Sequence, residues 1–147
     1  MVSRSQIVTE ARLWLGTPWQ HQASLKGVGA DCIGFVGGVA LELGLPGTAE
    51  WRDDKLLHSY SRLPDPDVLL EGCRRFMDRI RIHEAILADV LIMRARRVAQ
   101  PTHFALISRT DPRYIIHSRA ERRVAEHRLD NGLASLVLYA FRFRGVS

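Results

Sequence analysis

The sequence has few cysteines, no long apolar run and no spacing typical of metal ligands. Two cysteines among 147 residues are too few for a disulfide scaffold, so we expect both as free thiols. No apolar run is long enough to span a bilayer, so we expect no membrane insertion. Neither a Cys-x-x-Cys nor a His-x-x-x-His pair is present, so we expect no metal site.

The first residues also lack the apolar core of a signal peptide, so we expect synthesis in the cytoplasm without export by the usual route. An ordinary balance of 46% hydrophobic and 25% charged residues predicts one globular domain over residues 1–147. The net charge of +5 comes largely from arginine and fits an anionic partner, such as a bacterial envelope. Because the arginines are scattered and not interleaved with aromatic residues, we expect no specific nucleic-acid partner.

Helical patterns occupy the first half of the chain. The first helix opens with the capping-box pair Ser3 and Gln6, and the third opens with Asp65 and a proline at the first helical position. Residues 46–63 look irregular. The predicted helices cover residues 3–15, 32–43 and 66–80, and the packing anchors expected between the last two are Trp51, Tyr60 and Pro64.

Strand-like runs fill the second half. A turn at residues 110–112 joins two of them into a predicted hairpin. In the last run, alternation predicts one shared face for Val137, Tyr139, Phe141 and Phe143. The predicted strands cover residues 90–94, 103–108, 113–118, 124–129 and 136–143. Helices followed by an antiparallel sheet predict an α+β fold, with the helix that begins at Cys32 packed on the sheet.

A cysteine lies at the predicted start of the second helix. Asp31 is the expected N-cap, and Cys32 follows it in the first turn. Unpaired N–H groups and the positive end of the helix dipole favour a thiolate there, and the thiolate is the nucleophilic form. Cys73 lies on an amphipathic helix with no histidine pattern, so we expect it in the core.

A nucleophilic cysteine needs a base, and the base needs an orienting group. If the two central runs pair as a hairpin, His103 and His117 lie at its open end, one as base and the other as orienting group. We expect the thiolate–imidazolium pair to form before substrate binds. His127, across the sheet, is an alternative to His117. His21 either shapes the cleft or makes a hydrogen bond within its loop.

The oxyanion that develops during attack needs donors already in place. The backbone N–H of Cys32 is the natural first donor, and the preceding loop offers a second from Trp19, Gln20 or Gln22. The residues expected at the oxyanion site and substrate cleft are Trp19, Gln20, His21 and Asp31. Glycines after the cysteine indicate either close packing against the sheet or room for substrate: Gly34, Gly37 and Gly38.

Five blocks, in the right order along most of the chain, resemble those of the NlpC-type cysteine peptidases, which are papain-like cell-wall endopeptidases. The blocks are Gly16-Thr17-Pro18-Trp19, Asp31-Cys32-Ile33-Gly34, Ala88-Asp89-Val90-Leu91-Ile92, His103-Phe104-Ala105-Leu106-Ile107 and Ile116-His117-Ser118. Two further stretches resemble the branch found in phage tails and gene transfer agents: His21-Gln22-Ala23-Ser24 and Lys26-Gly27-Val28-Gly29.

The resemblance implies a papain-like fold with Cys32 as nucleophile, His103 as base and His117 as orienting residue. It implies hydrolysis of the D-glutamyl–diamino acid amide in peptidoglycan stem peptides, with no metal or organic cofactor. The branch implies phage-like tail proteins as partners and delivery to the wall within a virion or phage-like particle. Trp19 replaces the usual tyrosine, so no tyrosine hydroxyl assists there, and Ala88 replaces a common glycine in a turn.

Two other functions are compatible with the sequence. A thiol hydrolase or acyltransferase with the same three residues would act on another amide or ester. A non-catalytic tail or envelope assembly module would keep the fold and carry an unreactive Cys32. Identifying fragments released from peptidoglycan would distinguish the cell-wall peptidase from the first alternative. Measuring the reactivity of the Cys32 thiol would distinguish it from the second.

Overall fold

The first helix forms where its capping sequence predicts. The structure, a computed structural model, describes residues 1–51 and 65–147. Helix α1 (Arg4–Leu13) follows Ser3, whose hydroxyl accepts from the Gln6 N–H while the Gln6 side chain accepts from the Ser3 N–H. Gly16, with a φ of 86°, lies just beyond its end. The predicted helix is therefore confirmed with slightly shorter ends.

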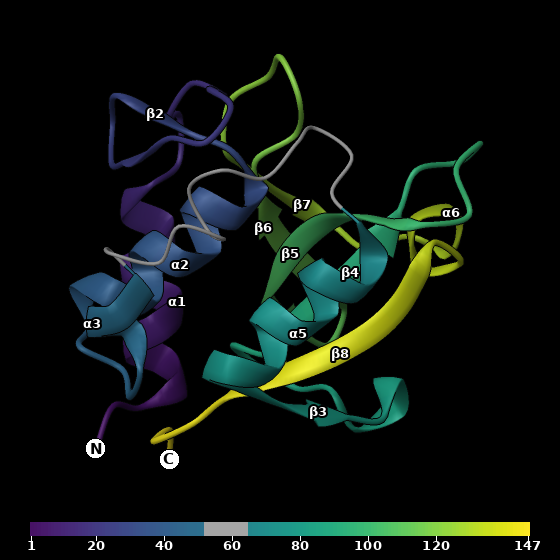
Figure 1. Cartoon of the computed structure of the whole chain (residues 1–147). Coiled ribbons are helices and arrows are strands. Elements are labelled where there is room, and N and C mark those ends of the chain that lie inside the picture. The colour runs from purple at the N-terminus through teal and green to yellow at the C-terminus, as the bar shows by residue number, and fades with distance from the viewer. Residues whose placement is uncertain (52–64) are drawn as a thin grey trace.

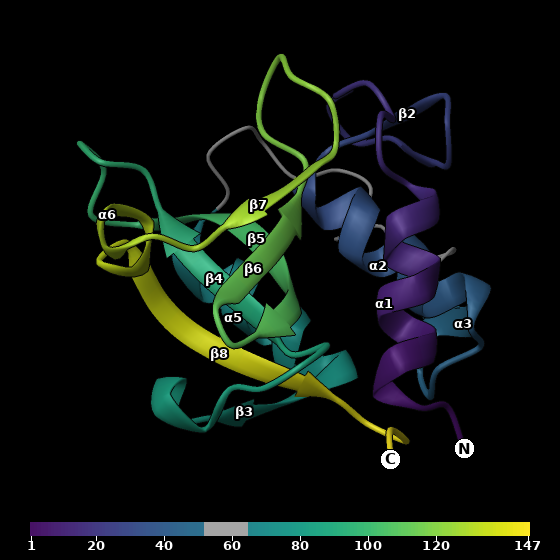
Figure 2. The same cartoon turned by 180° about the vertical axis from the view of Figure 1, so that it is seen from behind.

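Helix α2 (Cys32–Glu42) contacts both α1 and strand β5 (Pro101–Thr110), as Figures 1 and 2 show from opposite sides. The prediction that this helix packs on the sheet is confirmed. The loop before it contains a short hairpin that was not predicted, formed by β1 (Ser24–Leu25) and β2 (Gly29–Ala30).

Residues 46–63 were predicted to be irregular, but helix α3 (Thr48–Trp51) forms near the start of this segment. The rest of that segment, and the packing expected of Trp51, Tyr60 and Pro64, lie outside the described residues. Within the parts of the chain that the structure describes, no helix has the length and apolar character needed to cross a membrane.

Helix α5 (Pro66–Phe76) ends earlier than predicted. Asp65 caps it by accepting from the Asp67 and Val68 N–H groups. The prediction of a helix to about Ile80 is wrong, because Met77–Ile80 forms the edge strand β3, which pairs with β8 (Val137–Phe143). Met77 and Ile80, the apolar residues at the two ends of this segment, fit either a helix or a strand. Pairing with β8 selects the strand.

Six strands form one antiparallel sheet in the order β3-β8-β4-β5-β6-β7. The strands not yet given are β4 (Val90–Arg94), β6 (Arg113–His117) and β7 (Ala125–Arg128). The five predicted strands, the hairpin of β5 and β6 and the α+β fold are confirmed. Two further short elements were not predicted, the 3-10 helix η1 (Ile82–Glu84) and helix α6 (Asn131–Ala134).

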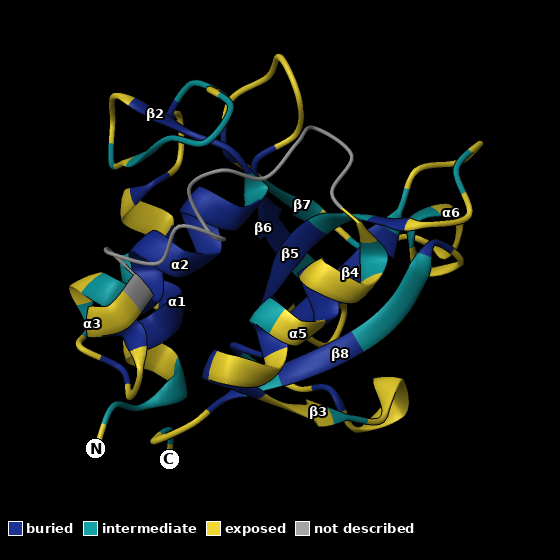
Figure 3. Cartoon of the chain, in the orientation of Figure 1, coloured by how far each residue is buried: buried dark blue, intermediate teal, exposed yellow. Residues whose placement is uncertain are grey.

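Apolar side chains cover both faces of the central strands, which are dark in Figure 3. A larger cluster joins the helices to one face and includes Trp14, Phe35 and Phe141. A smaller cluster on the other face includes Leu91 and Ile107. Because both faces are covered, four consecutive residues of β4 are buried, and the sequence there reads as a continuous apolar run.

An irregularity in β8 overturns one prediction of a shared face. Tyr139, Phe141 and Phe143 pack with the larger cluster, as expected. Val137 packs with the smaller cluster instead. The register of β8 against β4 shifts between the partners of Ile92 and Met93, so the alternation of faces does not continue to Val137.

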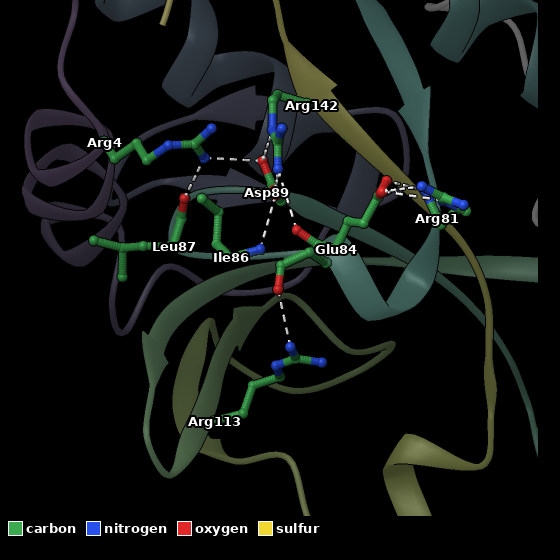
Figure 4. Close-up of polar contacts among 9 residues, drawn as sticks. Arg4, Arg81, Glu84, Ile86, Leu87, Asp89, Arg113 and Arg142 are labelled. Carbon is green, nitrogen blue, oxygen red and sulfur yellow. Dashed lines mark hydrogen bonds and ion pairs between the residues drawn. The ribbon is translucent and has the colours of Figure 1, made fainter. Parts of the chain in front are cut away.

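A buried carboxylate, that of Asp89, links α1, the start of β4 and β8 (Figure 4). Asp89 accepts from the Arg142 guanidinium at 3.0 and 2.8 Å and from Arg4 at 3.0 Å. It also accepts from the Ile86 N–H at 2.8 Å. This pairing raises the pKa of Arg142, and the bidentate contact compensates for burying the carboxylate.

Ala88, just before this carboxylate, adopts a φ of 69°, which glycine accommodates more easily. Its N–H donates to the Ile107 carbonyl, and the Ile107 N–H donates to the Asp89 carbonyl. The position therefore serves a turn into β4, and alanine there costs about 1 kcal/mol in backbone strain.

We expect Asp89→Ala to lower the free energy of unfolding by about 3 kcal/mol, because it leaves the two arginines and the Ile86 N–H without their shared acceptor. Asp78→Ala is the matched control. It removes an exposed ion pair with Arg144 and should cost less than about 1 kcal/mol. Urea unfolding followed by circular dichroism measures both values, and equal losses would contradict the role given to Asp89.

Candidate active site

Asp31 fixes the start of α2 and the loop that precedes it. Its Oδ1 accepts from the Gly34 N–H at 2.7 Å, which confirms the predicted N-cap. Its Oδ2 accepts from the Gln22 N–H, also at 2.7 Å, and lies 3.8 Å from Nδ1 of His21. The buried carboxylate therefore links the first turn of α2, which contains Cys32, to the preceding loop.

Two glycines of α2 allow close approach of other segments. A Cβ atom on Gly34 would overlap the carbonyl oxygen of Ala23, and one on Gly38 would overlap the Trp14 ring. Gly38 thus allows close packing, as predicted. The prediction that the sheet is its neighbour is wrong, because Trp14 at the end of α1 occupies that place. Gly34 likewise makes room for the preceding loop, and its position is not explained by substrate.

The Cys32 sulfur lies against the backbone of β5. Its Sγ is 4.0 Å from the Thr102 carbonyl oxygen, and the Phe104 backbone N–H stabilises negative charge on it. His103 lies between these two residues in the chain. Cys32, His103 and His117 all line one cavity of about 540 Å³, which we call the Cys32 cavity.

The histidines of the central hairpin meet as expected. His103 Nε2 lies 2.6 Å from His117 Nδ1. His117 Nε2 in turn lies 2.6 Å from His127 Nε2 on β7. The hypothesis that His127 replaces His117 as the partner of His103 is therefore wrong, because His127 extends the pair into a chain of three imidazoles.

Burial keeps these groups neutral. It raises the pKa of the Cys32 thiol to about 12, and the Asp31 carboxylate adds to this increase. Burial lowers the pKa of His103 to about 4 and that of His117 to about 2, and the Arg119 cation acts in the same direction on both. These shifts favour a neutral thiol beside a neutral imidazole over the expected thiolate–imidazolium pair.

Not all of the predicted cleft residues line the Cys32 cavity. Trp19, His21 and Asp31 line the Cys32 cavity, and the rings of Trp19 and His21 stack with centroids 6.3 Å apart. Gln20 does not line it, because its exposed side chain lies against Gly29. The Gln22 N–H is already bonded to Asp31. Of the three proposed sources of a second oxyanion donor, only Trp19 borders the cavity.

Sequence reasoning missed several residues at the cavity. Buried Ser118 donates to the Ala30 carbonyl at 2.7 Å and ties the end of β6 to the residue before Asp31. Arg94, Arg96 and Arg119 also line the cavity and give it a cationic wall. Arginine-rich stretches were visible in the sequence, but only the folded chain shows which of these arginines converge.

In the described ranges 1–51 and 65–147, no group of three or more histidine, cysteine, aspartate or glutamate side chains is arranged to hold a metal ion. Four ring nitrogens of the three histidines contact one another in two pairs, His103 Nε2 with His117 Nδ1 and His117 Nε2 with His127 Nε2. The arrangement instead supports proton transfer and nucleophilic attack by a thiol.

No protein-family model and no curated protein sequence matches the chain. Solved NlpC/P60 structures do match it. One from Bacillus cereus ATCC 10987 has a TM-score of 0.66 at 18% identity over 96% of this chain, and one from Staphylococcus aureus Mu50, described as similar to a lipoprotein, has 0.63 at 17% over 95%. The NlpC/p60 domain of the peptidoglycan hydrolase SagA has 0.59 at 18% over 97% of this chain and 100% of its own length.

These likenesses define the class of fold. The chain has the papain-like fold of NlpC/P60 proteins, and the predicted fold is confirmed. It spans only 40% and 41% of the lengths of the Bacillus and Staphylococcus proteins. At these identities the comparisons show the fold alone, and the chemistry has to be argued from the Cys32 cavity.

We expect iodoacetamide to alkylate Cys32 slowly at neutral pH and progressively faster up to about pH 10, because burial raises its pKa above the ordinary value. Mass spectrometry of the Cys32 peptide measures the rate at each pH. Buried Cys73, whose pKa is also raised to about 12, reports any loss of the fold. A rate that levels off below about pH 7 would indicate a preformed ion pair instead.

Proposed function

We propose that this chain is a cysteine peptidase of the NlpC/P60 family that hydrolyses amide bonds in bacterial cell-wall peptidoglycan. The observation that carries the proposal is one cavity lined by the helix-start thiol of Cys32 and the paired imidazoles of His103 and His117. The likeness to SagA, a peptidoglycan hydrolase, supports the substrate. The thiol and imidazole supply nucleophile and base, so the chemistry needs neither metal nor organic cofactor.

In the first half of the reaction, Cys32 passes its proton to Nδ1 of His103 as the sulfur attacks the amide carbonyl carbon. His103 uses Nδ1 because its Nε2 is bonded to His117. The backbone N–H groups of Cys32 and Ile33, which already favour negative charge at the sulfur, stabilise the developing oxyanion. The C–N bond then breaks, His103 protonates the leaving amine, and a thioester remains.

In the second half, His103 takes a proton from water as that water attacks the thioester carbonyl. The C–S bond breaks, the carboxylic acid leaves, and the proton returns to the Cys32 sulfur. Since burial keeps both groups neutral at rest, each half-reaction creates charge only as bonds change. Preorganised N–H donors at the helix start are therefore central to the rate.

The finer substrate proposal is the amide between D-glutamate and a diamino acid in stem peptides. Such peptides carry free carboxylates near the cut bond, and guanidinium groups pair well with carboxylates. Arg94, Arg96 and Arg119 line the Cys32 cavity and supply that complementary charge. A thiol hydrolase acting on a neutral ester or amide would gain nothing from this cationic wall.

We also propose that a phage-like tail delivers the protein to the wall. Support comes from the loop over residues 21–29, whose sequence resembles the tail-borne branch and which Asp31 holds against the nucleophile helix. Recovery of the chain with tail proteins from purified particles would support this context. Isolation of a free wall-lytic monomer with no such partners would contradict it.

One observation favours a second candidate, a non-catalytic assembly module on the same fold. The raised pKa of the Cys32 thiol is what an unreactive cysteine would also show. The paired histidines beside it favour the enzyme, because a packing role does not require imidazoles in that position. Turnover on peptidoglycan separates these two functions directly.

Purified peptidoglycan incubated with the protein should release soluble fragments with new amino groups, and mass spectrometry should place the cut in the stem peptide. Cys32→Ala should lower this release at least about 1,000-fold, because no other group supplies the nucleophile. Cys73→Ala is the matched control and should retain release. Equal release by wild type and Cys32→Ala, or none from wild type, would contradict the proposed peptidase.

Arg119→Gln should shift the acidic limb of the pH profile of kcat/KM to higher pH. The Arg119 cation lowers the pKa of His103, so its removal raises that pKa and leaves the base protonated up to a higher pH. Arg122→Gln removes an exposed cation outside the Cys32 cavity and should leave the limb in place. If Arg119→Gln left the acidic limb of the pH profile unchanged, the Arg119 cation would not be acting on the pKa of His103.

A further inference from the structure

Three imidazoles form a line across the neighbouring strands β5, β6 and β7. His103 Nε2 and His117 Nδ1 are 2.6 Å apart, and His117 Nε2 and His127 Nε2 are also 2.6 Å apart. The ring planes meet at 67° and 66°, so each contact is edge to edge through nitrogen and not a stacking of faces. Both distances are those of short hydrogen bonds.

A neutral imidazole has one N–H donor and one nitrogen lone pair. Each of the two contacts needs one donor and one acceptor, so the tautomer of any ring fixes those of the other two. The pKa values of His103 and His117 are lowered, and both rings are neutral at physiological pH. With all three rings neutral, the row of imidazoles has two ordered states, which differ in the direction of donation.

Only one direction suits a base. His103 can accept a proton from Cys32 only if its Nδ1 carries a lone pair, which places its hydrogen on Nε2 as donor to His117 Nδ1. His117 then donates from Nε2 to His127 Nε2. His127 carries its hydrogen on Nδ1, which lies 3.4 Å from the Arg128 carbonyl oxygen, an acceptor and never a donor.

We infer that His127 is a positioning residue that sets this direction, an inference that rests on the proposed function. By offering a lone pair to His117, His127 keeps the Nε2 hydrogen on His117 and so the Nδ1 lone pair on His103. In the reverse direction, His103 would present an N–H to the Cys32 sulfur and could not take its proton. His127 lies outside the residues that line the Cys32 cavity and contacts His117, so it orients the His103 ring through His117.

The test compares three variants with the wild type by nitrogen-15 NMR of labelled histidines, which identifies the tautomer of each ring. His127→Phe removes the acceptor with a ring of similar shape. His127→Gln keeps an acceptor oxygen and should rescue. His83→Phe alters an exposed histidine that is not part of the His103–His117–His127 row, and it is the matched control. A His103→Gln spectrum assigns the His103 signals.

We expect wild-type His103 to carry its hydrogen on Nε2, and His127→Phe to show a mixture of both tautomers at His103. On peptidoglycan, His127→Phe should lower kcat about 10- to 100-fold with KM unchanged, the size of loss seen when a partner that orients a metal-bound histidine ring is removed. His127→Gln should stay within about threefold of wild type in kcat and keep the wild-type tautomer.

An unchanged His103 tautomer in His127→Phe, or a kcat equal to that of wild type, would overturn the inference. Thermal unfolding of the variants excludes a lost fold as the reason for a lower kcat. The NMR readout does not require turnover. A tautomer shift without any cleavage of peptidoglycan would therefore support the role of His127 in orienting the chain while the proposed peptidase fails.

Discussion

The geometry of the candidate site depends on the buried carboxylate of Asp31. One oxygen accepts from the first turn of α2 and the other from the loop backbone at Gln22, so helix and loop share one anchor. Gly34 lets that loop lie against the helix, where any side chain would overlap Ala23. Ser118 binds the same region to the end of β6. The start of the nucleophile helix is thus held by the side chains of Asp31 and Ser118, which bind the backbone on either side of it.

Much of this site could be predicted because its signals are local. An aspartate before a cysteine and an apolar helical pattern predicts a capped helix, and the hairpin turn predicts that its two histidines approach. Both expectations hold for Asp31, His103 and His117. The fold class could be predicted for the same reason, since helical and strand periodicities occupy separate halves of the chain.

The remaining features depend on non-local pairing. The contact of His127 with His117 requires β7 to pair with β6 in one register, in which Ile115 faces His127, and no short sequence pattern sets that register. Likewise Met77–Ile80 becomes a strand only because β8 is available as its partner. The raised pKa of Cys32 and the lowered pKa of His103 reflect burial, a cause that a helix-dipole argument from the sequence does not include.

The two ends of the chain meet on the side away from the nucleophile. Val2 and Val146 form a parallel bridge, and the Ser147 N–H donates to the Val2 carbonyl. In Figures 1 and 2 both ends lie at the bottom, whereas α2 begins near the β1–β2 hairpin at the top. A tether fused to either end would hold the molecule at this lower end, opposite the start of α2. The reach of the thiol would then be set by the length and stiffness of the tether.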